Sequence, residues 1–156
     1  MKSIQTEGVN AGEATLAPKV IKDKKTKEYT LEFPGFEYKT SSARFVGKVE
    51  FCLYDQKTKE VLYNSKNVSG WEQGVVRTET DTEVIKNVAS SNLNIYRICN
   101  PSALKPLFSY NIGSSFEALN SWYQIVVTYY DQFGGKINTY KYSFNPYHVL
   151  NFEENY

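Results

Sequence analysis

The side chains that could carry out chemistry in this sequence are few, and none has the partners that its chemistry needs. His148 is the one histidine among 156 residues, and only Glu153 and Glu154 follow it as further metal ligands. A zinc site would need Cys or His residues at a defined spacing from His148, and these are missing. We therefore predict a surface or interface position for His148, and neither a metal nor another cofactor.

Catalytic chemistry is also poorly supported. A nucleophile such as Cys52 or Cys99 would need His148 and an orienting acid nearby, and no glycine pattern of a nucleophile elbow flanks either cysteine. Residues 78–83 alternate threonines with carboxylates, which could form a glycosidase or calcium site. We favour an edge strand protected by its charges. The sequence thus predicts no catalytic residue and a protein that is not an enzyme.

Binding chemistry is better represented. Trp71, Trp122 and Tyr130 could stack on the rings of a carbohydrate, and Trp122 and Tyr130 share one parity along their segment. Lysines within residues 19–27 form a basic run that could hold single-stranded nucleic acid. Because the run lacks aromatic residues and the formal net charge is only +1, we expect a solvated hairpin tip there and neither a nucleic-acid nor a membrane partner.

The elements that would position these residues are clearest in residues 122–144. Two alternating segments flank Asp131 and Gly134-Gly135, which predicts an antiparallel hairpin with one buried face and a turn whose glycines adopt positive φ. The residues expected in the core are Tyr123, Ile125, Val127, Tyr129, Tyr140, Tyr142 and Phe144.

Two further turns share the pattern Asp-x-Lys-Thr-Lys-Glu, at residues 23–28 and 55–60, each between two strand-like segments. We expect Asp23 and Asp55 to accept hydrogen bonds from N–H groups two or three residues further on. Elsewhere the patterns predict strands at 74–80 and 93–98. They also predict a short helix over Val84, Ile85 and Val88 after a capping-box spacing at 80–83, and a long connection with one helical turn at 101–121.

The two cysteines are not expected to form a disulfide. Cys52 has the opposite parity to the apolar residues of its segment, so it would point away from the core. The N-terminus carries no apolar leader, and no apolar run is long enough to span a membrane. Unless a leader was removed, we expect synthesis in the cytoplasm, with a virion as one possible destination.

Hairpins in series, with 13 Tyr and 9 Phe to pack between sheets, predict an all-β fold. We expect an immunoglobulin-like antiparallel β-sandwich with at most one or two short helices. Residues 1–17 would form an extended N-terminal arm, residues 18–144 the sandwich domain and residues 145–156 a C-terminal aromatic tail.

Residues 123–135 resemble the penultimate strand and turn of immunoglobulin-like domains of the polycystic-kidney-disease and bacterial Ig-like type. The pattern is a tyrosine near the strand start, alternating apolar residues and an aspartate at the turn: Tyr123, Ile125, Val127, Tyr129, Asp131, Gly134 and Gly135. The resemblance implies a sandwich and carries no active site. The architecture also resembles accessory proteins of tailed-phage virions, such as capsid decoration, head-fibre or neck components, which implies a place in an assembly.

We therefore expect a structural or interaction protein that binds other chains of an assembly, either copies of itself or a capsid protein. The partner-binding residues would lie in a tail too short to bury its own rings: Tyr147, Leu150, Phe152 and Tyr156. If removing the tail unfolds the domain, the tail is instead a last strand of the sandwich. The alternative function is a carbohydrate- or other ligand-binding module that uses Trp71, Trp122 and Tyr130.

Overall fold

The computed structural model describes residues 3–5, 16–40, 46–65, 83–90, 93–100, 105–131, 133–149 and 152–155. Strands dominate these residues, which confirms the all-β class. The elements are β1 (Ser3–Gln5), β2 (Lys19–Asp23), β3 (Tyr29–Phe33), β4 (Gly35–Thr40), β5 (Val46–Asp55), β6 (Val61–Asn64), β7 (Glu83–Ser90), β8 (Leu93–Cys99), β9 (Phe108–Gly113), α2 (Phe116–Leu119), β10 (Tyr123–Asp131), β11 (Lys136–Phe144), the 3-10 helix η2 (Pro146–His148) and β12 (Phe152–Asn155).

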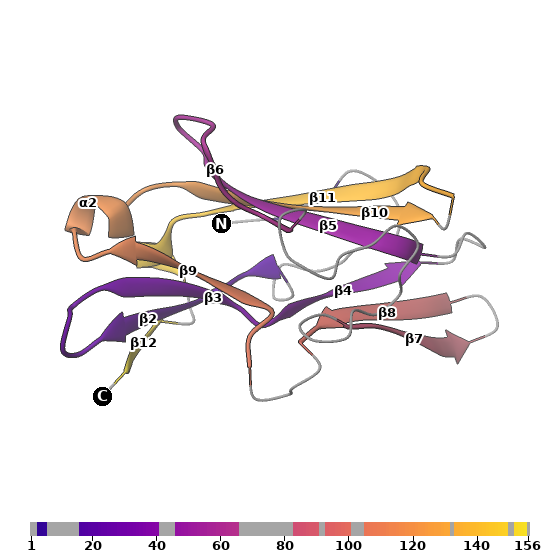
Figure 1. Cartoon of the computed structure of the whole chain (residues 1–156), viewed down its shortest axis with the longest axis horizontal. Coiled ribbons are helices and arrows are strands. Elements are labelled where there is room, and N and C mark those ends of the chain that lie inside the picture. The colour runs from indigo at the N-terminus through magenta and orange to yellow at the C-terminus, as the bar shows by residue number, and fades with distance from the viewer. Residues whose placement is uncertain are drawn as a thin grey trace.

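The strands form three hydrogen-bonded sheets in two layers. The sheet orders are β1-β11-β10-β5-β6, β12-β2-β3-β9 and β4-β8-β7. Among the described strands every pair is antiparallel except β12 with β2, which is parallel. Figure 1 shows the five-stranded sheet as the upper layer and the two smaller sheets side by side beneath it.

Pro34 stands at the boundary between the two smaller sheets. It separates β3, which pairs with β2 and β9, from β4, which pairs with β8. Proline has no N–H group to donate to a strand ladder, so the pairing is interrupted at this position. The chain continues in the same layer after Pro34, and the lower layer therefore covers a long upper sheet with two short ones.

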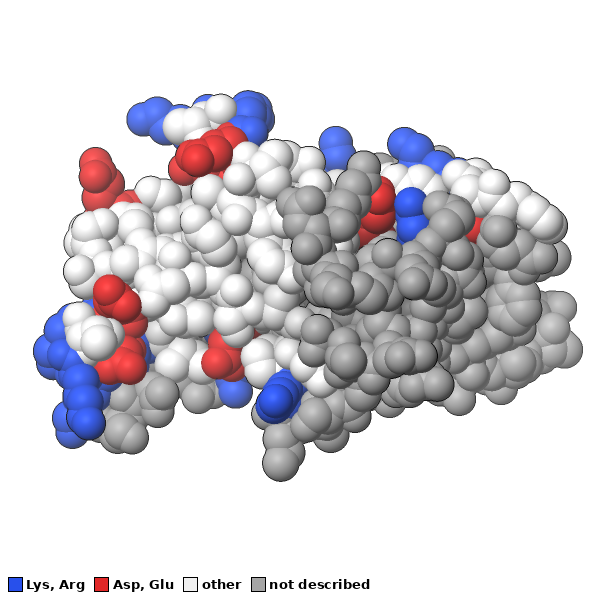
Figure 2. Space-filling view, in the orientation of Figure 1, with Lys and Arg blue, Asp and Glu red and all other residues white. Residues whose placement is uncertain are grey.

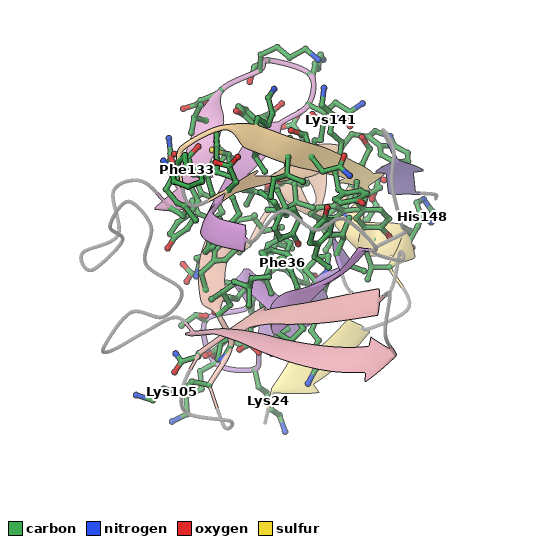
Figure 3. The ribbon with its side chains drawn as sticks, turned by 90° about the vertical axis from the view of Figure 1, so that its right-hand side faces the viewer. Lys24, Phe36, Lys105, Phe133, Lys141 and His148 are labelled. Atoms are coloured by element: carbon green, nitrogen blue, oxygen red, sulfur yellow. The ribbon has the colours of Figure 1, made fainter. Side chains whose placement is uncertain are left out.

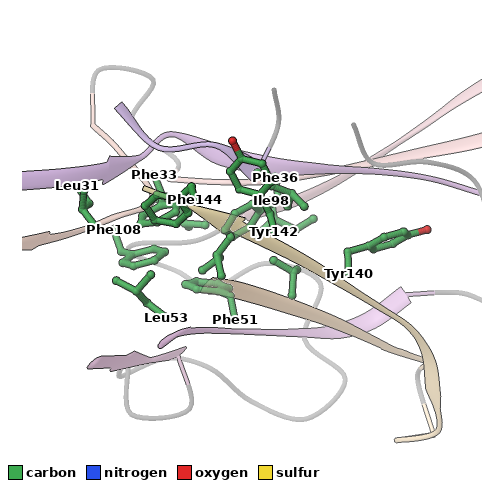
Figure 4. Close-up of a cluster of buried hydrophobic side chains, with 14 of the residues drawn as sticks. Leu31, Phe33, Phe36, Phe51, Leu53, Ile98, Phe108, Tyr140, Tyr142 and Phe144 are labelled. Carbon is green, nitrogen blue, oxygen red and sulfur yellow. The ribbon is translucent and has the colours of Figure 1, made fainter. Parts of the chain in front are cut away.

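The core lies between the layers, and half of its buried residues are aromatic; Figure 4 shows a cluster of them. Tyr38 of β4 stacks on Tyr129 of β10 with ring centroids 4.2 Å apart. Phe36 lies between the two layers (Figure 3) and packs edge-on against Phe51 of β5 at 5.4 Å. Both smaller sheets thus contribute rings to one continuous core, since Phe33 of β3 also contacts Phe144 of β11.

The predicted register of the β10–β11 hairpin is confirmed. All seven residues expected in the core are buried: Tyr123, Ile125, Val127, Tyr129, Tyr140, Tyr142 and Phe144. Val126 and Thr128 lie on the outer face and are half-buried. Cys52 of β5 is the register partner of Val126 on that outer face, and it is a thiol rather than half of a disulfide.

The chemistry predicted for the two Asp-x-Lys-Thr-Lys-Glu turns is also confirmed. Asp23 Oδ1 accepts hydrogen bonds from the N–H groups of Lys25 and Thr26, at 2.8 and 3.0 Å. Asp55 does the same for the groups two and three residues further on, Lys57 and Thr58, at 3.0 Å each. Both turns therefore have the same geometry, and the lysines contribute backbone N–H groups to it.

The third turn follows the same logic with one difference. Asp131 Oδ1 accepts from the N–H groups of Phe133 and Gly135, at 2.9 and 2.8 Å. Gly134 has a φ of +89°, whereas Gly135 is not among the residues with positive φ. Only one of the two glycines therefore supplies the left-handed conformation that we expected from both.

Two predictions for the middle of the chain are wrong. The helix expected over Val84, Ile85 and Val88 is instead strand β7, because these β-branched residues pair with β8 and tertiary pairing overrides the local capping signal. The connection expected over residues 101–121 does carry the helical turn α2, but it also contains strand β9, where buried Phe108 alternates with exposed Ser109. The strand at 93–98 is confirmed as β8, and the strand at 74–80 lies outside the described residues.

Both ends of the chain contribute strands at sheet edges. Ser3–Gln5, within the expected arm, pairs with β11 of the upper sheet. Phe152–Asn155, within the expected tail, pairs with β2 of the lower layer. The domain limits at residues 17 and 144 stay a prediction, but strand pairing extends beyond them in both directions.

Replacing Val127 by Ala should lower the free energy of unfolding by about 1–3 kcal/mol, because a fully buried methyl-bearing side chain leaves a cavity between the layers. The matched control is Val126→Ala, the same change one residue earlier on the half-buried outer face. Urea denaturation of both variants measures the difference. An equal loss in the two variants would contradict the register.

Replacing Lys27 or Lys59 by Gly should raise the free energy of unfolding by up to about 1 kcal/mol, because the left-handed backbone is strained for residues with a Cβ atom. Their φ values are +66° and +69°. Lys25→Gly and Lys57→Gly are the controls, since these lysines lie in the same turns without positive φ. The control variants should be less stable than the wild type in the same denaturation experiment.

Candidate functional site

Three partly exposed aromatic side chains lie at one end of the molecule. At this end β10 begins, β11 ends and the helix α2 lies (Figure 1). Phe116, Trp122 and Tyr147 are 58%, 43% and 51% exposed. Large apolar side chains gathered on a surface indicate a place where another molecule binds. We call these three residues the aromatic end.

The short helix α2 presents Phe116 to solvent. The Ser115 side chain caps the helix by accepting a hydrogen bond from the Ala118 N–H group at 3.0 Å. Phe116 and Leu119 are the first and last residues of this helical turn. Leu119 is buried, whereas Phe116 is exposed.

Asn145 fixes Tyr147 beside Phe116. The buried Asn145 side chain accepts a hydrogen bond from the Tyr147 N–H group at 3.0 Å and so begins η2. Its amide group donates to Asn120 Oδ1 at 2.9 Å, which ties η2 to the C-terminal end of α2. As a result the Tyr147 and Phe116 rings meet edge to face, with centroids 5.2 Å apart. The contact is therefore built into the fold.

A backbone hydrogen bond fixes the main chain at Trp122, while its side chain stays partly exposed. Its carbonyl oxygen accepts a hydrogen bond from the Gln56 N–H group at 3.0 Å. This contact joins the start of β10 to the turn that follows β5. The indole ring is partly exposed and so is accessible to a ligand or partner.

The two lysine-bearing turns lie in the same half of the molecule as the aromatic end: the turn after β2 is at the left margin, and the turn between β5 and β6 projects above the upper sheet (Figure 1). The turn after β2 lies beside β9, because Asn111 donates a hydrogen bond to Glu28 Oε1 at 3.1 Å. Figure 2 shows lysines at two projecting points on the left, each accompanied by carboxylates of the same turn. The aromatic end thus has charged groups of both signs around it, an arrangement typical of the rim of a protein interface.

Tyr123 anchors this end from beneath. Its ring is buried, and its hydroxyl group donates a hydrogen bond to the Ala118 carbonyl oxygen at 2.7 Å. Burial, with a smaller effect from the carboxylate of Asp55, raises the pKa of Tyr123 to about 12. The Tyr123 hydroxyl therefore stays protonated at neutral pH and keeps α2 against the sheet.

Tyr130 lies at the opposite end of β10 from Trp122. Eight residues of strand separate the two by about 27 Å, so they cannot contact one small sugar ring together. The Tyr130 hydroxyl donates to Glu50 Oε1 at 2.7 Å, and the Lys48 ammonium lies 4.6 Å from the ring centroid. Burial and the Glu50 carboxylate raise the pKa of Tyr130 to about 12. One face of this ring is therefore engaged with the protein itself.

The other residues that the sequence singled out are placed as follows. Leu150, Tyr156 and Trp71 lie outside the described residues, and of Phe152 the structure gives the strand position but not the side chain. His148 is exposed, and its ring contacts Tyr147 at 5.2 Å. In the described parts of the chain, no group of three or more His, Cys, Asp or Glu side chains could hold a metal ion. No helix in these parts is long and apolar enough to cross a membrane.

Sequence reasoning missed Phe116. The sequence offered only part of the signal, because Ser115 is a good helix cap but does not indicate which of Phe116 and Leu119 is buried. The contact with Tyr147 could not be read from the sequence, since 31 residues separate the two and the link runs through Asn120 and Asn145.

Comparisons of the chain with models of protein families, with curated proteins and with solved structures found no match.

Replacing Tyr123 by Phe should lower the free energy of unfolding by about 1 kcal/mol, because the Ala118 carbonyl loses its hydrogen bond. When the pH is raised into the alkaline range, the free energy of unfolding should fall less for this variant than for the wild type. A tyrosine whose pKa is 10.0 when unfolded and about 12 when folded stabilises the protein below pH 10, and that contribution disappears as the pH rises from about 10 through about 12.

The measurement is denaturant unfolding between neutral and strongly alkaline pH. Tyr147→Phe is the matched control, since it removes a hydroxyl from an exposed ring and should leave neutral stability unchanged. Parallel stability curves for the wild type and Tyr123→Phe across the alkaline range would contradict the assignment.

Proposed function

We propose that this protein is a non-enzymatic structural component, an immunoglobulin-like domain that binds other protein chains within a larger assembly through its aromatic end. The observation that carries the proposal is the half-exposed pair Phe116 and Tyr147, held in contact by hydrogen bonds to the protein framework. A fixed apolar pair needs no further ordering when a partner covers it, which favours binding.

The immunoglobulin-like part of the proposal is supported by strand order. In that fold strands A, B, E and D form one sheet, and strands G, F, C and C′ form the other. The upper sheet has the order β11-β10-β5-β6, which corresponds to G-F-C-C′. In the lower layer, β2, β3 with β4, β8 with β9, and β7 correspond to A, B, E and D. The strands β1 and β12 are then additions from the chain ends.

Tyr123 gives a second, independent support. Many immunoglobulin-like domains have a tyrosine near the start of strand F whose hydroxyl bonds to the backbone a few residues upstream. Tyr123 occupies this place at the start of β10, and its hydroxyl bonds to Ala118. Two residues later, where antibody domains have the second cysteine of their disulfide, stands the fully buried Ile125. Packing would thus replace the covalent link.

The architectural resemblance to accessory proteins of tailed-phage virions makes the proposal more specific. The assembly would be a virion, and the partners would be capsid or neighbouring accessory chains. A domain that acts there needs a stable framework and one exposed contact surface. The aromatic end, with lysines and carboxylates of two turns around it, has the apolar centre and charged rim that such a contact requires.

A second candidate function is favoured by Trp122. Its indole is 43% exposed, and an exposed indole can stack on a sugar ring. Because Tyr130 is distant and its ring lies against Lys48, a carbohydrate site would have to be built around Trp122 at the aromatic end. The two functions would therefore use different residues of the aromatic end: Phe116 and Tyr147 for a protein partner, and Trp122 for a sugar.

Replacing Phe116 by Ser should reduce the native mass of the assemblies that the protein forms, because the partner loses an apolar contact, while the domain keeps its fold. Sedimentation over a range of protein concentrations measures the mass, and circular dichroism checks the fold. Phe133→Ser is the matched control. Phe133 is 87% exposed in the turn at the opposite end, and its replacement should leave the mass unchanged.

The alternative function predicts other results. A wild-type chain that stays monomeric at every concentration, and that binds an immobilised glycan with loss of binding in Trp122→Ala, would overturn the proposal in favour of a carbohydrate-binding module. Equal effects of Phe116→Ser and Phe133→Ser would show that the aromatic end is not the contact surface.

A further inference from the structure

We infer that the C-terminal strand β12 is exchanged between copies of this chain, so that each copy completes the lower layer of the other by pairing its β12 with the partner copy's β2. This inference rests on the proposed function and names the partner as a second copy of the chain. It follows from the position of β12, its match to β2 and its closeness to the aromatic end.

The first observation is the position of β12 in the sheet. The chain leaves the upper layer at the end of β11, forms η2 and then joins the lower layer as its outermost strand (Figure 1). There β12 runs parallel to β2, unlike every other pair among the described strands. The C-terminus lies at the margin of the molecule, where a second copy can reach it.

The second observation is the match between the two strands. In the register Phe152 lies opposite Val20, and Glu154 lies opposite Lys22. Two of the four register pairs therefore match in residue type, one apolar with apolar and one acidic with basic, whereas Glu153 is paired with the apolar Ile21. The β2 strand of a second copy offers the same residues in the same order. An exchanged β12 therefore makes the same pairing as one that stays with its own chain.

The third observation is energetic. Strand β12 has only four residues, so few backbone hydrogen bonds hold it to β2. Parallel pairing is also slightly weaker per residue than antiparallel pairing, and β12 can therefore detach at low cost. Without β12 the N–H and C=O groups along the outer side of β2 would form an open sheet edge, which invites another strand. Exchange of a terminal element is a low-cost route to a dimer, because no new interface has to evolve for it.

The fourth observation links the exchange to the aromatic end. Tyr147 precedes β12 by only five residues, and Asn155 lies opposite Asp23, the first residue of a lysine-bearing turn at that end. A second copy that receives β12 must therefore approach beside Phe116 and Tyr147. The exchange thus supplies an occupant for the exposed aromatic pair.

The experiment uses disulfide formation between chains that each carry one new cysteine. Ile21 and Glu153 are register partners across β2 and β12. Neighbouring Cα atoms in a sheet lie within the range that a disulfide spans. Full-length Ile21→Cys and Glu153→Cys proteins are unfolded together, refolded together and oxidised. Mass spectrometry then identifies the linked peptides and separates this bond from any that involves Cys52 or Cys99.

The matched control replaces the exchanged strand by one that stays. Thr30 of β3 is also a register partner of Ile21, but β3 lies inside the sheet. A mixture of Ile21→Cys with Thr30→Cys chains should give no link. The double variant Ile21→Cys/Glu153→Cys in one chain verifies that the two positions are adjacent.

Exchange predicts a link between the Ile21→Cys and Glu153→Cys chains that increases with protein concentration and is absent from the control mixture. The inference is overturned if only the double variant forms the bond within one chain, if neither sample forms it, or if the control mixture links equally well. The proposed function is tested separately. If the mixed chains fail to link while Phe116→Ser still lowers the native mass, strand exchange is wrong and binding through the aromatic end stands.

Discussion

Contact between aromatic rings of the two layers is the interaction on which the rest of this structure depends. Tyr38 on Tyr129 and Phe36 on Phe51 join the lower layer to the upper sheet, and Phe33 reaches Phe144 at the other half of the core. Rings of this size fill the space between two pleated surfaces and bury much area per residue. The upper sheet can therefore be covered by two short sheets that meet at Pro34, without a single continuous lower sheet.

Covering the core in this way decides which aromatic residues remain outside. The rings at strand ends that point inward, such as Tyr123 and Phe144, are buried. Phe116 in α2 and Tyr147 in η2 lie outside the strands and are exposed. Phe116 and Tyr147 meet there because Asn145 binds both the start of η2 and Asn120. The contact surface that we propose is thus a consequence of the way the chain leaves β9 and β11, and not of a separate binding motif.

The chain ends follow from the same constraint. Two layers of antiparallel strands have open edges, and short terminal segments are available to cover them. The segment Ser3–Gln5 covers one edge of the upper sheet, and Phe152–Asn155 covers one edge of the lower layer. A segment that covers an edge through backbone hydrogen bonds can do so on its own chain or on a neighbour. In the strand exchange that we propose, the pairing that stabilises the domain would also join two copies of the chain.

The sequence by itself determined the features that depend on neighbours along the chain. The period of two in β10 and β11 predicts which rings are buried, and the hydrogen bonds of Asp23 and Asp55 to groups two or three residues away need no other part of the protein. Only the tertiary structure decided the features that depend on distant partners. Residues 83–90 form a strand because β8 is beside them, and Phe116 meets Tyr147 through two asparagines that are 25 residues apart. The tail becomes a strand because β2 offers it an edge. The physical reason is that backbone and side-chain groups far apart in sequence find their partners only when the layers have formed, and no local pattern records which partner that is.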